Sequence, residues 1–275
     1  MAWLTRRTRV IAIVAIAAAL LAATGAEAQF GRGRARARVA TAADHDGAFH
    51  FCRAWFRNGF IGDADGNWSV DYPQADLNLS IRLAELTTTA ISRDVSARPN
   101  HLIVRLTDDA LFQCPFIMMT EVGAAFLDDS EVARLREYLL KGGFLWVDDF
   151  WGTYAWDVWV SQIRKVFQPP DYPIIDLPAD HPIYRTQFVV AGTPQIPNIG
   201  WWLNTGTTSE RGPDSVDVHT RAITDENGRI MVLMTHNTDL GDSWEREADD
   251  PTYFYQFAAS GYAFGINVVL YALTH

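Results

Sequence analysis

Short apolar runs alternate with amphipathic segments along the first two-thirds of the chain. Four runs are typical of strands, because they combine β-branched, aromatic and other apolar residues between polar turns: AFHFCRAWF, HLIVRL, PFIMMT and FLWVDD. Two segments between them carry apolar residues at helical spacing: PQADLNLSIRLAELTTTA, which begins at Pro73, and DDSEVARLREYLLKGG. In the second, Asp128 and Glu131 form a capping-box pattern and Gly142 marks the end. This alternation predicts an α/β fold whose mostly parallel sheet is covered by helices on both faces.

The last third of the chain is less regular. YAWDVWVSQIRKVF predicts a helix, and VDVHTRAIT and RIMVLMT flank DENG as in a β-hairpin. The final segment, TYFYQFAASGYAFGINVVLYALT, predicts a long apolar helix with a stripe of small residues that lets it lie close to the sheet: Ala258, Gly261, Gly265 and Ala272. Polar residues interrupt this segment, which favours a packed core helix over a membrane anchor. We therefore expect no transmembrane helix in the mature chain.

The N-terminus has the pattern of an export signal. MAWLTRRTR is basic, VIAIVAIAAALLAA is apolar, and AEA at residues 26–28 is a small-x-small cleavage pattern. We predict a signal peptide at 1–28, an Arg-rich disordered linker at 29–48 and a single α/β domain at 49–275. The protein is expected to be exported, as a periplasmic or secreted protein. The paired arginines leave the choice between the Sec and twin-arginine routes open.

The balance of charge argues against some classes of partner. Of the 23 basic and 33 acidic residues, three arginines and one glutamate lie in residues 1–28, which leaves a net charge of −12 for the rest. An acidic chain disfavours nucleic acid and anionic membrane surfaces as partners. The basic stretch Gly31–Arg38 is the local exception. We interpret it as part of a solvated linker, with an arm for nucleic acid or lipid headgroups as the alternative.

The two cysteines, Cys52 and Cys114, lie in apolar, strand-like runs. Export would permit a disulfide between them. A buried free cysteine also behaves as a small apolar residue, and the sequence does not give the separation of the two side chains. The pattern leaves both states open.

Acidic residues follow several of the predicted strands. Parallel strands present their carboxyl ends at one edge of a sheet, where ligands bind. We therefore expect a shared site whose candidate catalytic residues are Asp148, Asp149, His236 and Glu121. The same loops supply candidate ligand-binding residues: Trp68, Asp71, Trp151, Asp239, Trp244 and Glu245. The three tryptophans lie in polar loops beside acids, which argues against a core role. The alternative for each acid is a helix N-cap, and for the histidine a structural role.

The segment DADGNWSVD at residues 63–71 places oxygen-bearing side chains at the spacing of a calcium loop. Its candidate metal ligands are Asp63, Asp65 and Asn67. The pattern departs from the motif at Trp68, where a glycine makes the sharp turn, and at Gln74, where a bidentate glutamate closes the site. A divalent cation therefore stays open as a cofactor, and the sequence names no other.

Common catalytic motifs are missing from the sequence. There is no G-x-S-x-G, P-loop, G-x-G-x-x-G or H-E-x-x-H, and the seven histidines are scattered rather than spaced as zinc ligands. These observations weigh against a serine or cysteine nucleophile, a nucleotide-binding enzyme and a zinc enzyme.

Five stretches carry a resemblance to a known family: WSVDYPQADLNL, LTDDALFQCPFIMMT, LREYLLKGGFLWVDDFWG, DHPIY and GINVVLYALTH. Together they resemble a bacterial family known as domain of unknown function 4159, which is in turn similar to the class I glutamine amidotransferases, most closely their trehalose-utilisation-type branch. The resemblance implies a flavodoxin-like sheet. It also implies that Asp148 and Asp149 occupy the turn that carries the amidotransferase cysteine, and that His236 lies near the position of the catalytic histidine. Because acids replace the cysteine, glutamine hydrolysis is not carried over.

Two functions are compatible with these patterns. The favoured one is a non-catalytic ligand-binding or assembly module of the cell envelope, with a small molecule, a carbohydrate or another envelope protein as its partner. The alternative is a hydrolase that acts on a sugar-like substrate through carboxylates, with or without a metal, because paired carboxylates with separated pKa values can act as acid and base. Convergence of Glu121, Asp148 and His236 would support the hydrolase, and their separation would remove that support.

Overall fold

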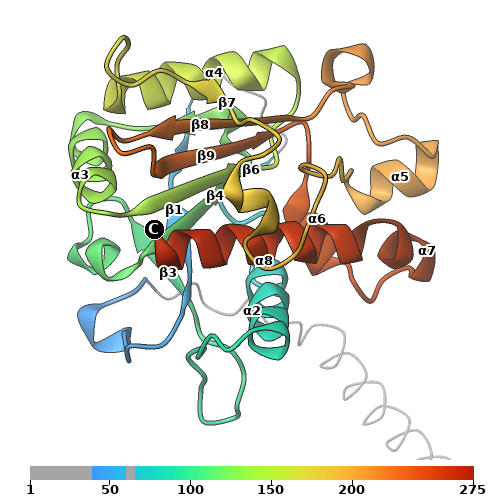
Figure 1. Ribbon diagram of the computed structural model, residues 1–275, viewed down its shortest axis with the longest axis horizontal. Helices are drawn as coiled ribbons and strands as arrows, with labels where there is room; N and C mark the ends of the chain where they lie inside the picture. Colours follow the sequence, from blue (N-terminus) through green and yellow to red (C-terminus); the bar gives the residue numbers. More distant parts are fainter. Residues whose placement is uncertain (1–38, 60–65) are drawn as a thin grey trace, which may run out of the picture. The chain divides into compact units, whose positions relative to one another are not determined.

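The centre of the fold is a sheet whose neighbouring strands are mostly parallel. In the residues that the computed structural model describes, 39–59 and 66–275, this sheet has seven strands in the order β3-β1-β4-β6-β9-β8-β7 (Figure 1). The first five strands in this order, from β3 to β9, are parallel to their neighbours. The last two, β8 and β7, pair antiparallel at one edge. The bounds are β1 Phe51–Trp55, β3 His101–Arg105, β4 Phe116–Thr120, β6 Phe144–Asp148, β7 Ile175–Asp176, β8 His219–Thr224 and β9 Ile230–His236. The prediction of a mostly parallel α/β sheet is confirmed.

Helices cover both faces of the sheet, as predicted. On one face lie α3 (Asp129–Leu140) and α4 (Gly152–Val166); on the other lie α2 (Gln74–Leu86), α6 (Leu240–Glu245) and α8 (Ala259–Thr274). Figure 1 shows α8, in red, lying along the sheet with α2 next to it. The remaining elements are short: β2 Arg57–Asn58 and β5 Ala125–Phe126, which pair with each other, α5 Ile199–Thr205, α7 Pro251–Tyr253, a π-helical turn at Phe254–Ala258, and 3₁₀ turns at Ala42–Asp44, Asp109–Gln113, Val122–Ala124, Pro182–Arg185 and Gly212–Ser215.

Strand β4 explains why the central strands are apolar throughout. Ile117 and Met119 belong to the core under α3 and α4, whereas Phe116 and Met118 belong to the core under α2 and α8. A strand covered on both faces has no solvent side, so its residues do not alternate between apolar and polar. The result is two hydrophobic layers, one on each side of the sheet.

The local signals in the sequence define several element ends. The Asp128 side chain accepts hydrogen bonds from the backbone N–H groups of Ser130 and Glu131, which confirms the predicted capping box of α3. Gly142, just beyond this helix, has a φ of 105°, which favours glycine. The predicted hairpin is also present, since β8 and β9 are antiparallel and joined by a short turn.

The described domain begins before residue 49. Val39 forms a bridge to Ile103 of β3, and the compact unit runs from Val39 to His275. The predicted signal peptide and the stretch Gly31–Arg38 lie outside the described residues. Part of the predicted disordered linker, at Val39, is therefore attached to the edge strand of the sheet.

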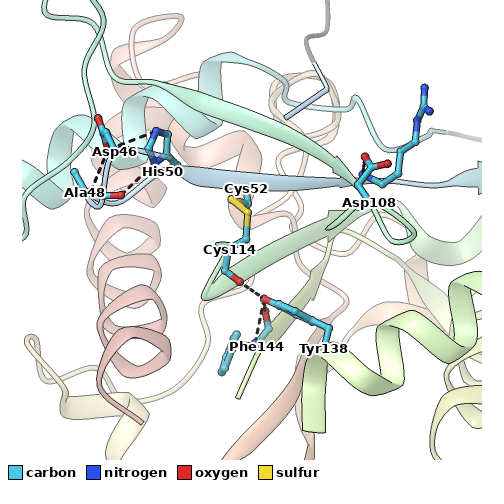
Figure 2. The surroundings of a disulfide bond; sticks show 9 residues. Asp46, Ala48, His50, Cys52, Asp108, Cys114, Tyr138 and Phe144 are labelled. Atoms are coloured by element: carbon cyan, nitrogen blue, oxygen red, sulfur yellow. Dashed lines mark hydrogen bonds and ion pairs between the residues drawn. A yellow bond between two sulfur atoms is a disulfide. The ribbon is translucent and has the colours of Figure 1, made fainter. Parts of the chain in front are cut away.

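Cys52 and Cys114 form a disulfide, which resolves the choice that the sequence left open. Figure 2 shows the bond joining Cys52 of β1 to Cys114, which lies between the 3₁₀ turn at Asp109–Gln113 and the start of β4. The Tyr138 hydroxyl of α3 lies 2.8 Å from the Cys114 carbonyl oxygen and 3.3 Å from that of Phe144. These contacts tie α3 to the amino ends of two neighbouring strands, opposite the edge where the acids lie.

The C-terminal helix packs on another helix as well as on the sheet. Two of its glycines face α6, because a Cβ at Gly265 would lie 2.5 Å from Cζ2 of Trp244 and one at Gly261 would overlap Ser243. The expectation that these glycines allow close approach to the sheet is corrected accordingly. Among the described residues, Pro251–Thr274 is a helical stretch long and apolar enough to cross a membrane, and 61% of its most apolar window is buried inside the domain.

Candidate functional site

Three neighbouring parallel strands end in polar residues with a left-handed backbone. Glu121 follows β4, Asp149 follows β6 and Asn237 follows β9, with φ values of 54°, 56° and 65°. Asp71, in the loop before α2, has a φ of 62°. Residues other than glycine rarely adopt this conformation, and such strain is concentrated at functional sites. The carboxyl edge of the sheet is therefore the candidate functional site.

Asp148 ends β6 and holds the start of α6. Its carboxylate accepts hydrogen bonds from Thr235 Oγ1 at 2.5 Å, from the Leu240 N–H at 2.8 Å and from the Gly241 N–H at 3.3 Å. Complete burial raises the pKa of Asp148 to about 7, although these donors favour its charged form. Because both oxygens already accept hydrogen bonds, Asp148 positions α6 rather than presenting an oxygen to a ligand.

Asp149 and Glu121 occupy the ends of adjacent strands. The backbone N–H of Glu121 donates to the Asp149 carbonyl oxygen at 3.0 Å, and Asp149 Oδ1 accepts from Trp151 Nε1 at 3.0 Å. The side chain of Glu121 lies against Gly66, where a Cβ would be 2.5 Å from Glu121 Cγ. Burial, and then repulsion by Glu121, raises the pKa of Asp149 well above its usual range. The carboxylate of Asp149 is therefore buried, with the partly buried Glu121 near enough to repel it.

Asp71, Asp149 and Asp239 meet at the centre of the site. One carboxylate oxygen from each lies within 4.8 Å of those from the other two, and all three side chains are buried. Asp71 Oδ2 has no hydrogen-bond partner in the described residues. A Cβ at Gly241 would overlap this oxygen, so the glycine allows the carboxylate to lie against the backbone of α6. Burial is also the main cause that raises the pKa of Asp71 and Asp239 well above the usual range.

A second carboxylate group shares Asp71 with the first. Oxygens of Asp71, Asp242 and Glu245 also lie within 4.8 Å of one another. This group is better neutralised: Asp242 Oδ2 accepts from the Ile199 N–H at 2.6 Å, and Arg246 Nε lies 3.3 Å from Asp242 Oδ1 and 2.8 Å from Glu245 Oε2. The guanidinium of Arg246 therefore neutralises the two acids that belong only to the outer group, Asp242 and Glu245.

Sequence reasoning missed the buried ion pair between Arg53 of β1 and Asp76 of α2. Both side chains are fully buried. Arg53 Nε donates to Asp76 Oδ1 at 3.1 Å, and Nη1 donates to Thr120 Oγ1 at 3.0 Å and to the Val70 carbonyl oxygen at 3.2 Å. The signal was an arginine inside an otherwise apolar strand, where a charge needs a buried partner. This pair links β1, β4 and α2 directly beside the acidic site.

His236 lies on the other face of the sheet from Asp148. Its ring packs 4.9 Å from the Phe150 ring and 5.3 Å from the Trp156 ring, and its Nε2 is 3.0 Å from the Gly152 carbonyl oxygen. Burial lowers its pKa to about 4, so the ring is neutral at neutral pH. The structure thus brings Glu121 close to Asp149 but separates His236 from Asp148, and the shared site expected from the sequence does not include the histidine.

A family model matches residues 57–273, which include both carboxylate groups and Arg53's partners on β4 and α2. The family is described as Domain of unknown function (DUF4159). The chain belongs to this family. No curated protein matches the sequence significantly. Within the DUF4159 domain, the acidic edge is formed by residues from the loop before α2, the turns after β4 and β6, and the segment around the start of α6.

The candidate tryptophans of the DUF4159 domain are mostly buried. Trp244 is 0% exposed and packs against Trp146 with ring centroids 5.6 Å apart, and Trp151 is 4% exposed. Trp68 is partly buried, next to the core and 5.7 Å from the Tyr72 ring. The polar flanking residues argue against a core role for these tryptophans, but Trp244 has such a role. Trp151 acts on the site by donating its N–H to Asp149.

The predicted calcium loop is only partly within the described residues. Asp63 and Asp65 lie outside them. The Asn67 side-chain oxygen accepts hydrogen bonds from the backbone N–H and the hydroxyl of Ser69, so it closes a local turn. Asp71, the ninth residue of that segment, contributes to the central carboxylate group instead.

The central group presents oxygen donors in a buried setting. Carboxylate oxygens at this spacing suit either a shared proton or a hard divalent cation such as Ca²⁺, Mg²⁺ or Mn²⁺. His236 offers no nitrogen ligand to it, because the ring faces the α4 side of the sheet. The candidate metal ligands in the described residues are therefore acids alone.

Proposed function

We propose that this DUF4159 protein is an exported, non-catalytic module of the cell envelope that binds a small ligand at the acidic edge of its sheet. The observation that carries this proposal is the set of strained polar residues, Glu121, Asp149 and Asn237, at three neighbouring strand ends. A chain that only needed turns at these points would be more stable with glycine. Of the three, Glu121 and Asp149 bring carboxylates to the site, whereas the Asn237 side chain is hydrogen-bonded to the backbone of Gly152 and Asp217. We therefore assign the two strained acids to ligand binding.

Export is supported by the N-terminal sequence pattern and by the Cys52–Cys114 bond. Stable disulfides form in oxidising compartments such as the bacterial periplasm. The basic, apolar and small-residue stretches in the first 28 residues match a cleavable signal. Both observations support a periplasmic or secreted location.

We also infer a flavodoxin-like fold related to the amidotransferases. Numbered along the chain, the five parallel strands have the order 2-1-3-4-5, which is the doubly wound order of flavodoxin. The turn after β6 has the left-handed Asp149 where an amidotransferase has its cysteine. Both cysteines of this chain are bonded to each other, so a thiolate nucleophile has no counterpart here.

The absence of catalysis is supported by the contacts of the candidate residues. Asp148 has donors on both oxygens, and His236 faces the other side of the sheet, where its Nε2 donates to the Gly152 carbonyl oxygen. The pairing of a nucleophile or acid with a nearby base is the arrangement that acid–base and nucleophilic catalysis require. The residues first suspected of forming such a pair are separated by the sheet.

A carboxylate hydrolase is the second candidate, and the neighbouring acids Glu121 and Asp149 favour it. Repulsion between two close carboxyl groups raises the pKa of one of them, which then acts as the acid while the other acts as base or nucleophile. Burial, and after it repulsion by Glu121, raises the pKa of Asp149 well above its usual range. A sugar-like substrate would have to reach this pair from the rim of the site.

Native mass spectrometry of the protein expressed with its own N-terminus tests the proposal. We expect the mature mass to start at or near Gln29, and an organic adduct on the purified protein, or after addition of glucosamine or maltose. The adduct should be lost in Asp149→Asn and kept in Asp180→Asn, an exposed acid used as the control. An uncleaved Met1 would contradict export, and the lack of any organic adduct on wild-type protein would overturn ligand binding.

An assay with p-nitrophenyl glycosides separates the two candidate functions. A non-catalytic module should release no p-nitrophenol above the level of the Asp149→Asn protein. Release that depends on both Glu121 and Asp149 would instead establish the hydrolase.

A further inference from the structure

We propose that Asp71, Asp149 and Asp239 bind one hard divalent cation, with Ca²⁺ as the best-fitting ion. This inference rests on the proposed function in taking the acidic edge as the binding site, and it names an ion there. The three residues come from three separate segments: the loop before α2, the turn after β6 and the residue before α6. One oxygen from each lies within 4.8 Å of the other two.

Asp71 gives the independent sign that a ligand belongs at this point. Its side chain is 7% exposed, and its Oδ2 has no hydrogen-bond partner in the described residues. This oxygen lies against Gly241, whose N–H is directed to Asp148 Oδ2 instead. A buried carboxylate oxygen without a donor or a cation is strongly disfavoured. The backbone of Asp71 is also held in the left-handed region, which fixes the direction of the side chain.

The charge of the central group is only partly offset by described basic side chains, because Arg53 attracts Asp71 but directs its hydrogen bonds to other groups. Arg53 donates to Asp76, Thr120 and Val70, and Arg246 pairs with the outer acids and Asp249. The charges that act most strongly on Asp149 and Asp239 are those of other carboxylates. A bound divalent cation would compensate this repulsion and supply the partner that Asp71 Oδ2 lacks.

Ca²⁺ suits this donor set best among the hard divalent cations. It binds six to eight oxygens at about 2.3–2.6 Å in flexible geometry, which fits acids supplied by three separate segments. Mg²⁺ requires near-octahedral geometry at about 2.0–2.1 Å and keeps several waters, so it is less suited to a buried set of protein carboxylates. The two oxygens of Asp148 accept three hydrogen bonds and stabilise the helix that carries Asp239, which makes Asp148 a positioning residue.

Isothermal calorimetry and thermal melts on the purified full chain test the site. After EDTA treatment and removal of the chelator, CaCl₂ should bind with one ion per chain and raise the Tm, because a ligand that binds the native state stabilises it by mass action. Asp71→Asn and Asp239→Asn should each weaken Ca²⁺ binding at least about tenfold, since affinity follows the charge of the ligand set. Both variants should melt at or above the wild-type temperature without the ion, because each removes a repelling charge.

Two controls separate this site from its rivals. Asp180→Asn removes an exposed acid and should leave Ca²⁺ affinity unchanged. Asp65→Ala removes an acid of the predicted calcium loop and should also leave the affinity unchanged. Loss of binding in Asp65→Ala with retention in Asp239→Asn would assign the ion to that loop and overturn the proposal.

The outcomes also distinguish this inference from the proposed function. A wild-type protein whose Tm and calorimetric signal do not respond to Ca²⁺, Mg²⁺ or Mn²⁺ overturns the cation site. If that protein still binds glucosamine or maltose through Asp149, the proposed function stands alone. Binding of Ca²⁺ that Asp71→Asn and Asp239→Asn do not weaken would likewise refute the assignment of these ligands.

Discussion

Asp148 and His236 end neighbouring parallel strands, and they face opposite sides of the sheet. The register pairs Val147 with Met234, which places Asp148 beside Thr235 and leaves His236 one residue further along β9. Successive side chains of a strand point to opposite faces, so Asp148 meets α6 while His236 meets α4. One residue of register therefore decides that the acid and the histidine belong to different environments.

Replacement of Asp148 separates its role as a cap from its effect as a buried charge. Asp148→Asn keeps an oxygen for the N–H groups of Leu240 and Gly241 and removes the charge, so we expect stability at pH 7–8 to be unchanged or increased. Asp148→Ala leaves these N–H groups and Thr235 without their acceptor and should cost about 1–3 kcal/mol. Urea unfolding of both variants measures the difference.

Asp128 provides a matched control for this comparison. It also caps a helix, but it is only partly buried, and hydrogen bonds from Ser130 and the Glu131 N–H, together with its ion pair with Arg57, hold its pKa below the usual range. Its charge is therefore stabilising, and Asp128→Asn should lower stability where Asp148→Asn does not. An equal loss from both asparagine variants would mean that burial of Asp148 does not disfavour its charge.

The stability of the protein should depend on pH through His236. Burial lowers its pKa to about 4, and the usual value is about 6.5. A group whose pKa is depressed on folding contributes stability above its unfolded pKa and loses it as the pH falls toward the folded pKa. Between pH 7 and pH 5 we expect His236 to account for a loss of about 2 kcal/mol.

Comparison of wild type with His236→Gln isolates this contribution, because other groups titrate in the same range. The groups facing His236 are Arg221 and His219 of β8 and Asp214 of the turn at Gly212–Ser215; the first two oppose protonation and the third favours it. The difference in unfolding free energy between the two proteins should move in favour of the variant as the pH is lowered. A difference that stays constant from pH 7 to pH 5 would show that the imidazole is not buried in its neutral form.

Local signals made most of the fold predictable from the sequence. The capping box at Asp128 and Glu131 and the left-handed Gly142 lie within a few residues of the helix that they define. The alternation of strands and helices fixes the class of fold, because parallel strands need crossover connections. None of these inferences requires knowledge of which distant segments meet.

The site was less predictable because its members meet through tertiary packing. Arg53 and Asp76 are 23 positions apart and lie in segments with different periodicities, so nothing local marks them as a pair. Trp244 has polar neighbours along the chain, yet α8 covers it completely. His236 follows a strand as expected, but the pleat, which depends on the register, turned it away from the acids. A residue's position next to a strand end therefore predicts the edge of the sheet at which its side chain lies, but not the face of the sheet.

The disulfide should contribute strongly to stability. Cys52 and Cys114 close a loop with a sequence separation of 62, and bridges over loops of this size contribute about 2–4 kcal/mol in typical cases. We expect the double variant Cys52→Ala/Cys114→Ala to unfold at lower urea concentration, with the same signature for wild type in reductant. Two titratable thiols in wild-type protein denatured without reductant would show that the bond is not formed.

The packing of α8 against α6 should be sensitive to a single methyl group. A Cβ at Gly265 would lie 2.5 Å from Trp244 Cζ2 and 3.2 Å from Leu79 Cδ1, and overpacked cores lose about 1–3 kcal/mol. Gly265→Ala should therefore lower the Tm, whereas Gly192→Ala, with no atom within 4 Å of the added Cβ, should not. The clash is with the indole, so Trp244→Phe should reduce the additional cost of Gly265→Ala, which a double-mutant cycle measures as a coupling energy. If the two effects are strictly additive, the cost of Gly265→Ala arises elsewhere in α8.

The same substitution should also affect the proposed cation site, because α6 contains both Trp244 and Gly241, and Gly241 lies against Asp71. The Gly265→Ala protein should therefore bind Ca²⁺ more weakly than wild type, although all three ligands are still present.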